Sequence, residues 1–155
     1  CDRFGLRRAP ATWWYGSRRI DAGQRGGFRS FDPMSAATQA LGETGERVAA
    51  RWLVRRGWRV LAWRYRSGHR DIDLVAERDR TVAFVEVKTR RGDRFGGPVG
   101  AVGWRKQREL SRSAAVWMDR HGQPDLAYRF DVIGVIISGG KVRLRHVEDA
   151  FSPRL

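Results

Sequence analysis

Two charged side chains lie inside an apolar, strand-like segment. Residues 81–90 read TVAFVEVKTR, and Glu86 and Lys88 follow five residues that are typical of a buried strand. Because side chains alternate along a strand, Glu86 and Lys88 share one face with Phe84, and the opposite face is apolar as well. A strand with two apolar faces is usually covered on both sides, where an ionised carboxylate costs several kcal/mol unless it is compensated. Glu86 therefore needs a cation or hydrogen bonds.

The preceding segment, DIDLVAE at residues 71–77, carries further acids. Strict alternation puts Ile72, Leu74 and Ala76 on one face, and Asp71 and Asp73 on the other. If the hairpin closes with Arg78 opposite Thr81, Asp73 faces Glu86 directly, with β-carbons about 5 Å apart. The turn Asp79-Arg80 is not a favoured hairpin turn, and a slip of one residue would put the two acids on opposite faces unless a bulge restored the match.

Two facing carboxylates repel each other unless one is protonated or a cation lies between them. A divalent cation is the natural occupant, and all-oxygen ligands favour Mg²⁺ or Mn²⁺ over zinc. Such an ion can activate a phosphodiester for hydrolysis, with Lys88 holding the attacking water or the scissile phosphate. The competing interpretation is a simple ion pair between Glu86 and Lys88, two residues apart on one strand.

A third acid lies in the preceding helical segment. Glu46 shares a helical face with Ala49, Ala50 and Leu53, which is the face expected to look inward. Glu46 could overlook the same site, or it could be an ordinary first-turn glutamate that complements the helix dipole.

The elements that must position these residues follow from periodicity and from the turn residues. We expect a helix over residues 36–56, strands over 58–65, 71–77 and 81–88, a Gly-rich loop over 90–100, a helix over 104–120, and strands over 128–137 and 141–148. The order is α-β-β-β-α-β-β in a single α/β domain over residues 34–155, and short connections imply antiparallel neighbours.

Residues 1–33 show neither helical nor strand periodicity. They form either a disordered basic arm or sequence upstream of a true start at Met34, which directly precedes the first patterned segment. Residues 34–155 hold 24 Lys and Arg against 14 Asp and Glu, so the basic character belongs to the domain.

The whole chain of 155 residues has a formal net charge of +14, which favours an anionic partner such as nucleic acid. The single cysteine, Cys1, excludes an intrachain disulfide and a cysteine-based zinc site, and the three histidines lack ligand-like spacing. We expect a cytoplasmic protein with no membrane partner, because no apolar run approaches the roughly 20 residues of a membrane span.

Basic residues surround the candidate site on the loops and on the second helix. They suit a phosphate backbone, although a solvated basic face is the alternative, and contact is favoured for Arg90, Arg91 and Arg94 because the Gly-rich loop follows Lys88 directly. The full set comprises Arg64, Arg66, Arg70, Arg90, Arg91, Arg94, Arg105, Lys106, Arg108 and Arg112.

Twelve residues separate Asp73 from Glu86, and one residue separates Glu86 from Lys88. This spacing resembles the PD-(D/E)xK nuclease signature. The segments GETGERVAARWLVRRGWRVLAWRYR, DIDLVA, FVEVKTR, KQREL and RFDVIGV together resemble the YraN family of small bacterial proteins, which are similar to archaeal Holliday-junction resolvases. The resemblance covers roughly residues 38–150. It implies a restriction-endonuclease-like αβββαβ core, with a mixed central sheet flanked by helices.

The resemblance also implies roles for individual residues. Asp73 and Glu86 would be metal ligands, Lys88 the catalytic lysine and Glu46 the acid of the first helix. Lys106 and Gln107 match the basic and amide positions of the second helix, and Asp131 matches a strand acid. Where relatives usually read Gly-Glu-Ile-Asp, this chain reads RDID, so Asp71 offers a second carboxylate on the Asp73 face.

The leading hypothesis is a Mg²⁺- or Mn²⁺-dependent DNA endonuclease, acting on branched DNA such as Holliday junctions or on single-stranded DNA. The alternative is a nucleic-acid-binding protein that keeps the fold without turnover, and a third reading is a structural interaction protein. Junction cutting would suggest a homodimer, because two strands must be cut.

Overall fold

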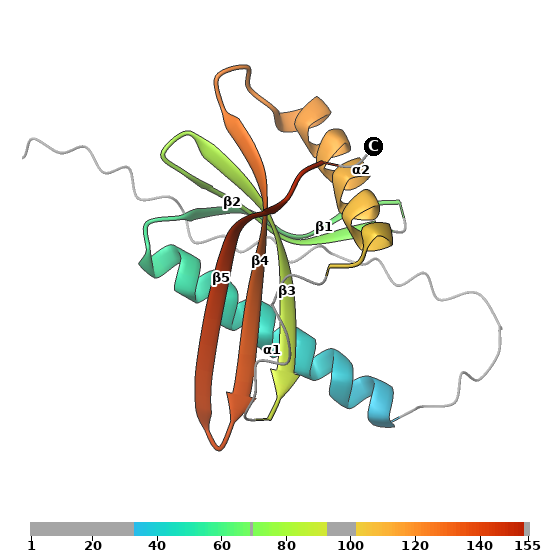
Figure 1. The fold of residues 1–155 in the computed structure, drawn as a ribbon, viewed down its shortest axis with the longest axis vertical. Coiled ribbons are helices and arrows are strands. Elements are labelled where there is room, and N and C mark those ends of the chain that lie inside the picture. Colours follow the sequence, from blue (N-terminus) through green and yellow to red (C-terminus); the bar gives the residue numbers. More distant parts are fainter. Residues whose placement is uncertain (1–32, 69, 93–101, 154–155) are drawn as a thin grey trace, which may run out of the picture. The chain divides into compact units, whose positions relative to one another are not determined.

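The computed structural model describes residues 33–68, 70–92 and 102–153 (Figure 1). The elements are α1 (Pro33–Arg55), β1 (Arg59–Ser67), β2 (Arg70–Arg78), β3 (Thr81–Arg91), α2 (Trp104–His121), β4 (Ala127–Ser138) and β5 (Lys141–Phe151). Their order confirms the α/β prediction, and the core is consistent with the restriction-endonuclease-like fold. Neither α1 nor α2 is long and apolar enough to cross a membrane. Residues 1–32 lie outside the described residues, so the basic arm and the start at Met34 stay predictions.

The five strands form one mixed sheet in the order β1-β2-β3-β4-β5. Three of the four strand pairs are antiparallel hairpins, namely β1 with β2, β2 with β3 and β4 with β5, whereas β3 and β4 run parallel. Parallel neighbours need a crossover, and α2 lies in the connection between them. The sheet therefore places three strands before the crossover helix and a long hairpin after it (Figure 1).

Each face of the sheet is covered by one helix, as the two apolar faces of β3 predicted. One core cluster packs Leu53 of α1 against Val85 of β3 and Ile133 of β4. The other packs Leu110 and Trp117 of α2 with strand residues such as Val82 and Phe84. Burial of these apolar side chains on both sides is the main source of stability, at about 25 cal/mol per Å² of apolar surface removed from water.

The turn between β2 and β3 fixes the register that brings the acids together. Arg78 pairs with Thr81 and Leu74 with Val85, which is the register the sequence analysis assumed. Asp79 and Arg80 both have positive φ, 49° and 59°, which is the backbone of a type I′ hairpin turn made without glycine. Because a slip would turn every buried side chain of β3 to the wrong face, packing imposes this turn on unfavourable residues.

Candidate active site

Asp73 lies where the ladder between β2 and β3 ends. The last paired residues are Leu74 and Val85, one step before Asp73 and Glu86 would pair. Asp73 Oδ2 instead accepts a hydrogen bond of 2.7 Å from the backbone N–H of Val87. A side-chain carboxylate thus takes the place of a strand carbonyl, while β2 remains paired with β1 as far as Arg70. The two acids meet at an opening between adjacent strands.

The alternation of β2 changes at the same point. Ile72 packs with Val75 on the α2 side of the sheet, whereas Leu74 packs on the α1 side. The prediction that Ile72 shares a face with Leu74 was therefore wrong. The register of β1 carries Arg64 opposite Asp73, and Arg64 has a φ of 49°, so both strands leave regular geometry there. This irregularity turns Asp73 toward the gap beside β3.

Glu86 is buried, with 3% of its surface exposed, on the face that α2 covers. Its Oε1 accepts a hydrogen bond of 2.6 Å from Lys88 Nζ. Its Oε2 lies 3.2 Å from Lys106 Nζ of α2, yet accepts no hydrogen bond from the described residues. Glu86 thus has two ammonium neighbours and one buried oxygen that accepts no hydrogen bond from the described residues.

The surroundings of Asp73 raise its pKa to about 7. Burial is the largest cause, followed by the negative charge of Glu86, and Glu46 adds a smaller contribution in the same direction. The Val87 N–H and the charge of Lys106 oppose the rise in pKa. A carboxyl whose ionisation is disfavoured by burial and by a neighbouring negative charge marks a place where a cation would be stabilised.

Glu46 is buried, with 8% of its surface exposed, and comes from the inward face of α1 as predicted. Arg64 binds it through both ends of the guanidinium, with Nε 2.7 Å from Oε2 and NH2 3.1 Å from Oε1. Trp63 Nε1 donates a third hydrogen bond to Oε2, at 3.0 Å. The hydrogen bonds to Glu46 hold the pKa of Arg64 above its usual range. Glu46 is therefore fixed by β1 while its charge acts on Asp73.

The donor set fits a hard divalent cation in part. Asp73 and Glu86 supply two carboxylates at one opening, and Glu86 Oε2, 3.2 Å from the Lys106 ammonium, accepts no hydrogen bond from the described residues. Oxygen ligands of this kind suit Mg²⁺ or Mn²⁺, which keep several waters in their coordination shell. Among the described residues no group of three or more His, Cys, Asp or Glu is placed to hold a metal ion. The fit therefore rests on the two acids, with water completing the shell.

The other predicted site residues lie around this centre with different partners. Asp71 is half-exposed and lies 3.5 Å from Arg66 Nε in an ion pair across β1 and β2. Gln107 donates a hydrogen bond of 2.7 Å to the Val102 carbonyl, so its amide fixes the start of α2. Arg105 pairs with Glu109 at 3.3 Å on the outer side of the helix. Arg90 and Arg91 are exposed at the end of β3, and Arg94 lies outside the described residues.

Asp131, the strand acid matched by the resemblance, lies in a different polar network. Its Oδ2 is 2.7 Å from His146 Nε2, and its Oδ1 accepts a hydrogen bond of 3.0 Å from the Asp149 N–H. Arg129 NH2 also donates to Oδ2, at 3.1 Å. These contacts tie β4 to β5 at the register shift beside Phe130, so Asp131 is a structural residue of the hairpin. The role of His146 could not be predicted from the sequence, because its pairing with Asp131 joins two strands and leaves no local spacing signal.

Gly45 was also missed, although it lies directly before Glu46. A β-carbon at Gly45 would lie 1.7 Å from Thr89 Oγ1 and 2.7 Å from Thr89 Cβ. The backbone of α1 therefore touches β3 here, and only glycine allows this approach. The glycine in the segment GETGER is the signal that could have predicted it.

Replacing Gly45 with Ala is expected to destabilise the protein by about 1–3 kcal/mol, the usual cost of overpacking a well-packed contact. The added methyl group must push α1 away from Thr89, which also displaces Glu46. Urea unfolding measures the change. Gly42→Ala is the matched control, because nothing lies within 4 Å of a β-carbon at that position of the same helix. Gly42→Ala should be neutral or stabilise by up to about 1 kcal/mol, and equal effects of the two substitutions would contradict the contact.

Comparison with known proteins agrees with the motifs in the sequence. A UPF0102 protein of Alkaliphilus metalliredigens is 40% identical over 114 residues, covering 74% of this chain and 99% of that protein. A UPF0102 protein of Geobacter metallireducens is 38% identical over 118 residues, covering 76% of this chain and 97% of that protein. The UPF0102 protein STH1475 of Symbiobacterium thermophilum is 43% identical over 117 residues, covering 74% and 98% respectively.

The family comparison covers the part of the chain that builds the site. Residues 45–135 match the uncharacterised protein family UPF0102, a span that runs from Gly45 through Asp73, Glu86, Lys88 and Lys106 to β4. With this match and with relatives at about 40% identity over nearly their whole length, the chain belongs to the uncharacterised protein family UPF0102, the YraN family that its sequence motifs indicated.

Proposed function

We propose that this protein is a Mg²⁺- or Mn²⁺-dependent DNA endonuclease that hydrolyses phosphodiester bonds. The observation that carries the proposal is the meeting of Asp73 and Glu86 at the opening between β2 and β3, beside Lys88. Ionised Asp73, whose pKa is raised by burial and by the charge of Glu86, is costly to the fold, and such cost is common where a site serves chemistry.

Asp73 and Glu86 would hold the metal, and Glu86 Oε2 is the oxygen with free acceptor capacity. Bound there, the ion would polarise the phosphodiester and stabilise the charge that develops during displacement. Lys88 has 47% of its side chain exposed, so its ammonium can reach a substrate while it stays close to Glu86. It would hold the scissile phosphate or orient the attacking water. Lys106 is half-buried against Glu86 and would keep that carboxylate in place.

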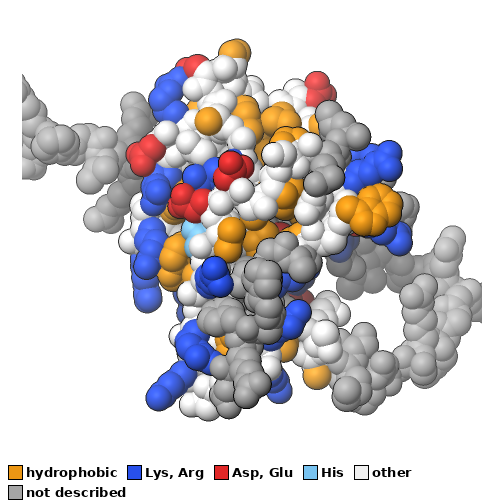
Figure 2. Space-filling view, viewed as in Figure 1, with side chains coloured by type: hydrophobic (Ala, Val, Ile, Leu, Met, Phe, Trp, Pro, Cys, Tyr) orange, Lys and Arg blue, Asp and Glu red, His pale blue; other side chains and the backbone are white. Residues whose placement is uncertain are grey.

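The basic surface supports DNA as the substrate. Arg90 and Arg91 continue β3 beyond Lys88 and are exposed. On the face seen in Figure 2, Lys and Arg side chains lie mainly along the left edge, in the lower part and on the right, whereas Asp and Glu side chains lie at the centre and in the upper part. Such a surface favours binding to a phosphate backbone, and the affinity should fall steeply with salt. Branched DNA as substrate, and a homodimer that cuts two strands, are part of the same proposal.

A second candidate is a nucleic-acid-binding protein without turnover. Lys88 and Lys106 already balance the charge of Glu86 without a metal, and the described residues offer only a pair of acids. This candidate predicts salt-sensitive DNA binding and no cleavage with any divalent metal.

Incubation of the protein with branched, single-stranded and duplex DNA in Mg²⁺, Mn²⁺ or EDTA tests the proposal. We expect cleavage that depends on the metal, and calorimetric titration with Mn²⁺ should show a binding site. Binding of DNA with no cleavage of any substrate in either metal would overturn the nuclease proposal and support the second candidate.

A further inference from the structure

Trp104 is an exposed aromatic residue at the beginning of α2. Its exposed fraction is 70%, whereas Trp58 and Trp117 are almost completely buried. The other large hydrophobic side chains that are exposed among the described residues are the aliphatic Val54 and Val142. Exposing an indole to water forgoes a large gain from burial. Trp104 therefore adds little buried apolar surface to the core, although its side chain is large.

Trp104 begins a basic stripe on the outer face of α2. Residues four apart on a helix share a face, spaced about 6 Å along the axis, which aligns Trp104 with Arg108 and Arg112. Both arginines are exposed, and neither has a carboxylate partner among the described residues. The inner face of the same helix is formed by Leu110 and Ala114, which are buried. The stripe is not needed to pack the helix against the sheet.

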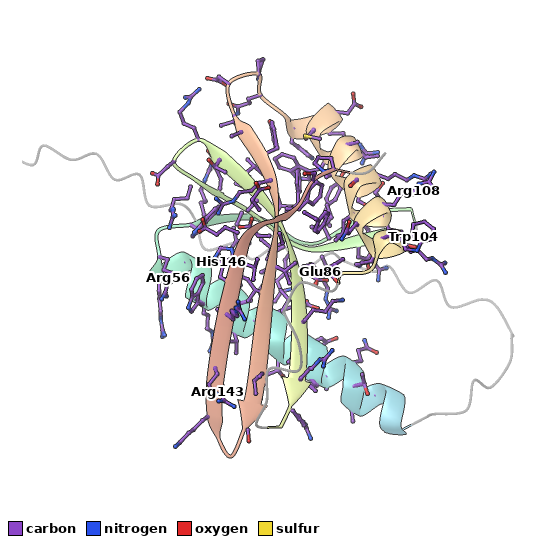
Figure 3. The ribbon with its side chains drawn as sticks, viewed as in Figure 1. Arg56, Glu86, Trp104, Arg108, Arg143 and His146 are labelled. Carbon is purple, nitrogen blue, oxygen red and sulfur yellow. The ribbon has the colours of Figure 1, made fainter. Side chains whose placement is uncertain are left out.

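The stripe begins at the end of α2 whose inner side reaches the candidate active site. Lys106, two residues after Trp104, lies 3.2 Å from Glu86 Oε2. Figure 3 shows Trp104 and Arg108 projecting from the same end of α2, the end nearer to Glu86. Trp104 and Lys106 are about 3 Å apart along the helix axis, but two residues turn the helix by about 200°, so the indole lies on the outer side of α2 and Lys106 on the side that faces Glu86.

We propose that Trp104 is a stacking platform for an unpaired nucleobase of DNA, with Arg108 and Arg112 binding the adjoining phosphates. Indole rings stack on any base, and cations along the same face add backbone contacts. Bases within a duplex are already stacked and cannot reach the indole, so the platform selects DNA with a single-stranded segment beside the scissile phosphate. The inference rests on the proposed function, because the platform would present DNA to the nuclease site. Stacking itself needs neither metal nor turnover.

Charge complementarity favours a nucleic acid over a protein partner. The exposed indole is accompanied by cations at two successive positions of its helical face, and the chain has a formal net charge of +14. Aromatic side chains interleaved with basic ones are the common arrangement of surfaces that bind single strands. A protein interface would instead need a broader apolar area around the indole.

Binding of fluorescein-labelled oligothymidylate and of a duplex of equal length, both in EDTA, tests the platform. We expect Trp104→Ala to weaken binding of the single strand by roughly 5- to 100-fold. The same substitution should change duplex binding by no more than about twofold, because duplex binding depends on phosphate contacts. Trp104→Phe should keep most of the single-strand affinity, because it keeps a ring that can stack.

Val142→Ala is the matched control, since it removes an exposed apolar side chain from β5 and should leave both affinities unchanged. Equal losses for single strand and duplex, or no loss for either, would overturn the platform. A change in oligomeric state of Trp104→Ala in sedimentation velocity would also overturn it, in favour of a protein interface. These binding measurements are made without metal, so they test the platform separately from cleavage. Stacking can be confirmed in a protein that does not cleave DNA, and cleavage can be confirmed in a protein whose Trp104 does not stack.

Discussion

Replacing Glu86 with Gln is expected to reduce metal-dependent DNA cleavage by at least roughly 10²- to 10³-fold. Glutamine keeps the shape of the buried side chain but removes the charge that pairs with both lysines and that the proposed metal would require. Losing one preorganised electrostatic contact at the reacting centre typically costs that much in rate. Single-turnover cleavage of a labelled substrate in Mn²⁺ measures the effect, and calorimetry should show a parallel loss of Mn²⁺ binding.

Glu77→Gln is the matched control for this substitution. Glu77 lies on β2 and forms an ion pair with Arg59 at 2.5 Å. Its replacement is the same change from Glu to Gln, made at the opposite end of the hairpin. The cleavage activity of Glu77→Gln should stay within about twofold of the unaltered protein. Glu77 lies away from the candidate site, and loss of a partly exposed ion pair should leave the fold nearly as stable as before. If Glu86→Gln cleaves DNA as fast as the unaltered protein, Glu86 takes no part in the chemistry.

Replacing Asp73 with Asn is expected to stabilise the protein at pH 8 and to have little effect at pH 4. The pKa of Asp73 is about 7 in the folded state against 3.8 ordinarily. Well below pH 4 the Asp73 carboxyl is protonated in both the folded and the unfolded state, so it does not change the free energy of unfolding. Between pH 4 and 7 only the unfolded state loses the proton, so the free energy of unfolding falls as the pH rises and stays low above pH 7. The full difference corresponds to about 4 kcal/mol at most.

Asparagine removes this penalty, because its side-chain oxygen can still accept the hydrogen bond from the Val87 N–H while the charge is absent. Urea unfolding in EDTA at pH 4 and pH 8 measures the difference, and Asp71→Asn on the same strand is the control, expected to change stability by less than about 1 kcal/mol at either pH. At 100 times its dissociation constant, Mn²⁺ should stabilise the unaltered protein by about 3 kcal/mol at pH 8 and Asp73→Asn by much less. If the free energy of unfolding changed with pH in the same way for the unaltered protein and for Asp73→Asn, the raised pKa of Asp73 would be contradicted.

The secondary structure and the pairing of β2 with β3 were accessible from the sequence. The short connection between Arg78 and Thr81 allowed the hairpin register to be stated as a condition, and the pairing of these two residues meets it. Turn chemistry argued against it, because Asp79 and Arg80 are poor residues for positive φ. The register survived because β3 is buried on both faces, and packing outweighs the preference of two turn residues.

What could not be predicted depends on contacts between distant segments. The end of the ladder at Asp73, the bond from its carboxylate to the Val87 N–H and the approach of Lys106 to Glu86 leave no periodic trace. The hydrogen bonds from Trp63 and Arg64 to Glu46 are likewise long-range. The acids and the basic residues, Lys106 and Arg64 included, could therefore be named from the sequence, whereas the contacts between them could not.

The opening at Asp73 also joins the two layers of the protein energetically. Glu46 on α1 raises the pKa of this carboxyl and Lys106 on α2 lowers it, although the helices cover opposite faces of the sheet. A displacement of either helix must then change the proton affinity of one shared group. Substitutions in α1 and α2 that touch no common residue should for that reason give non-additive free energies, with the coupling carried by a single proton.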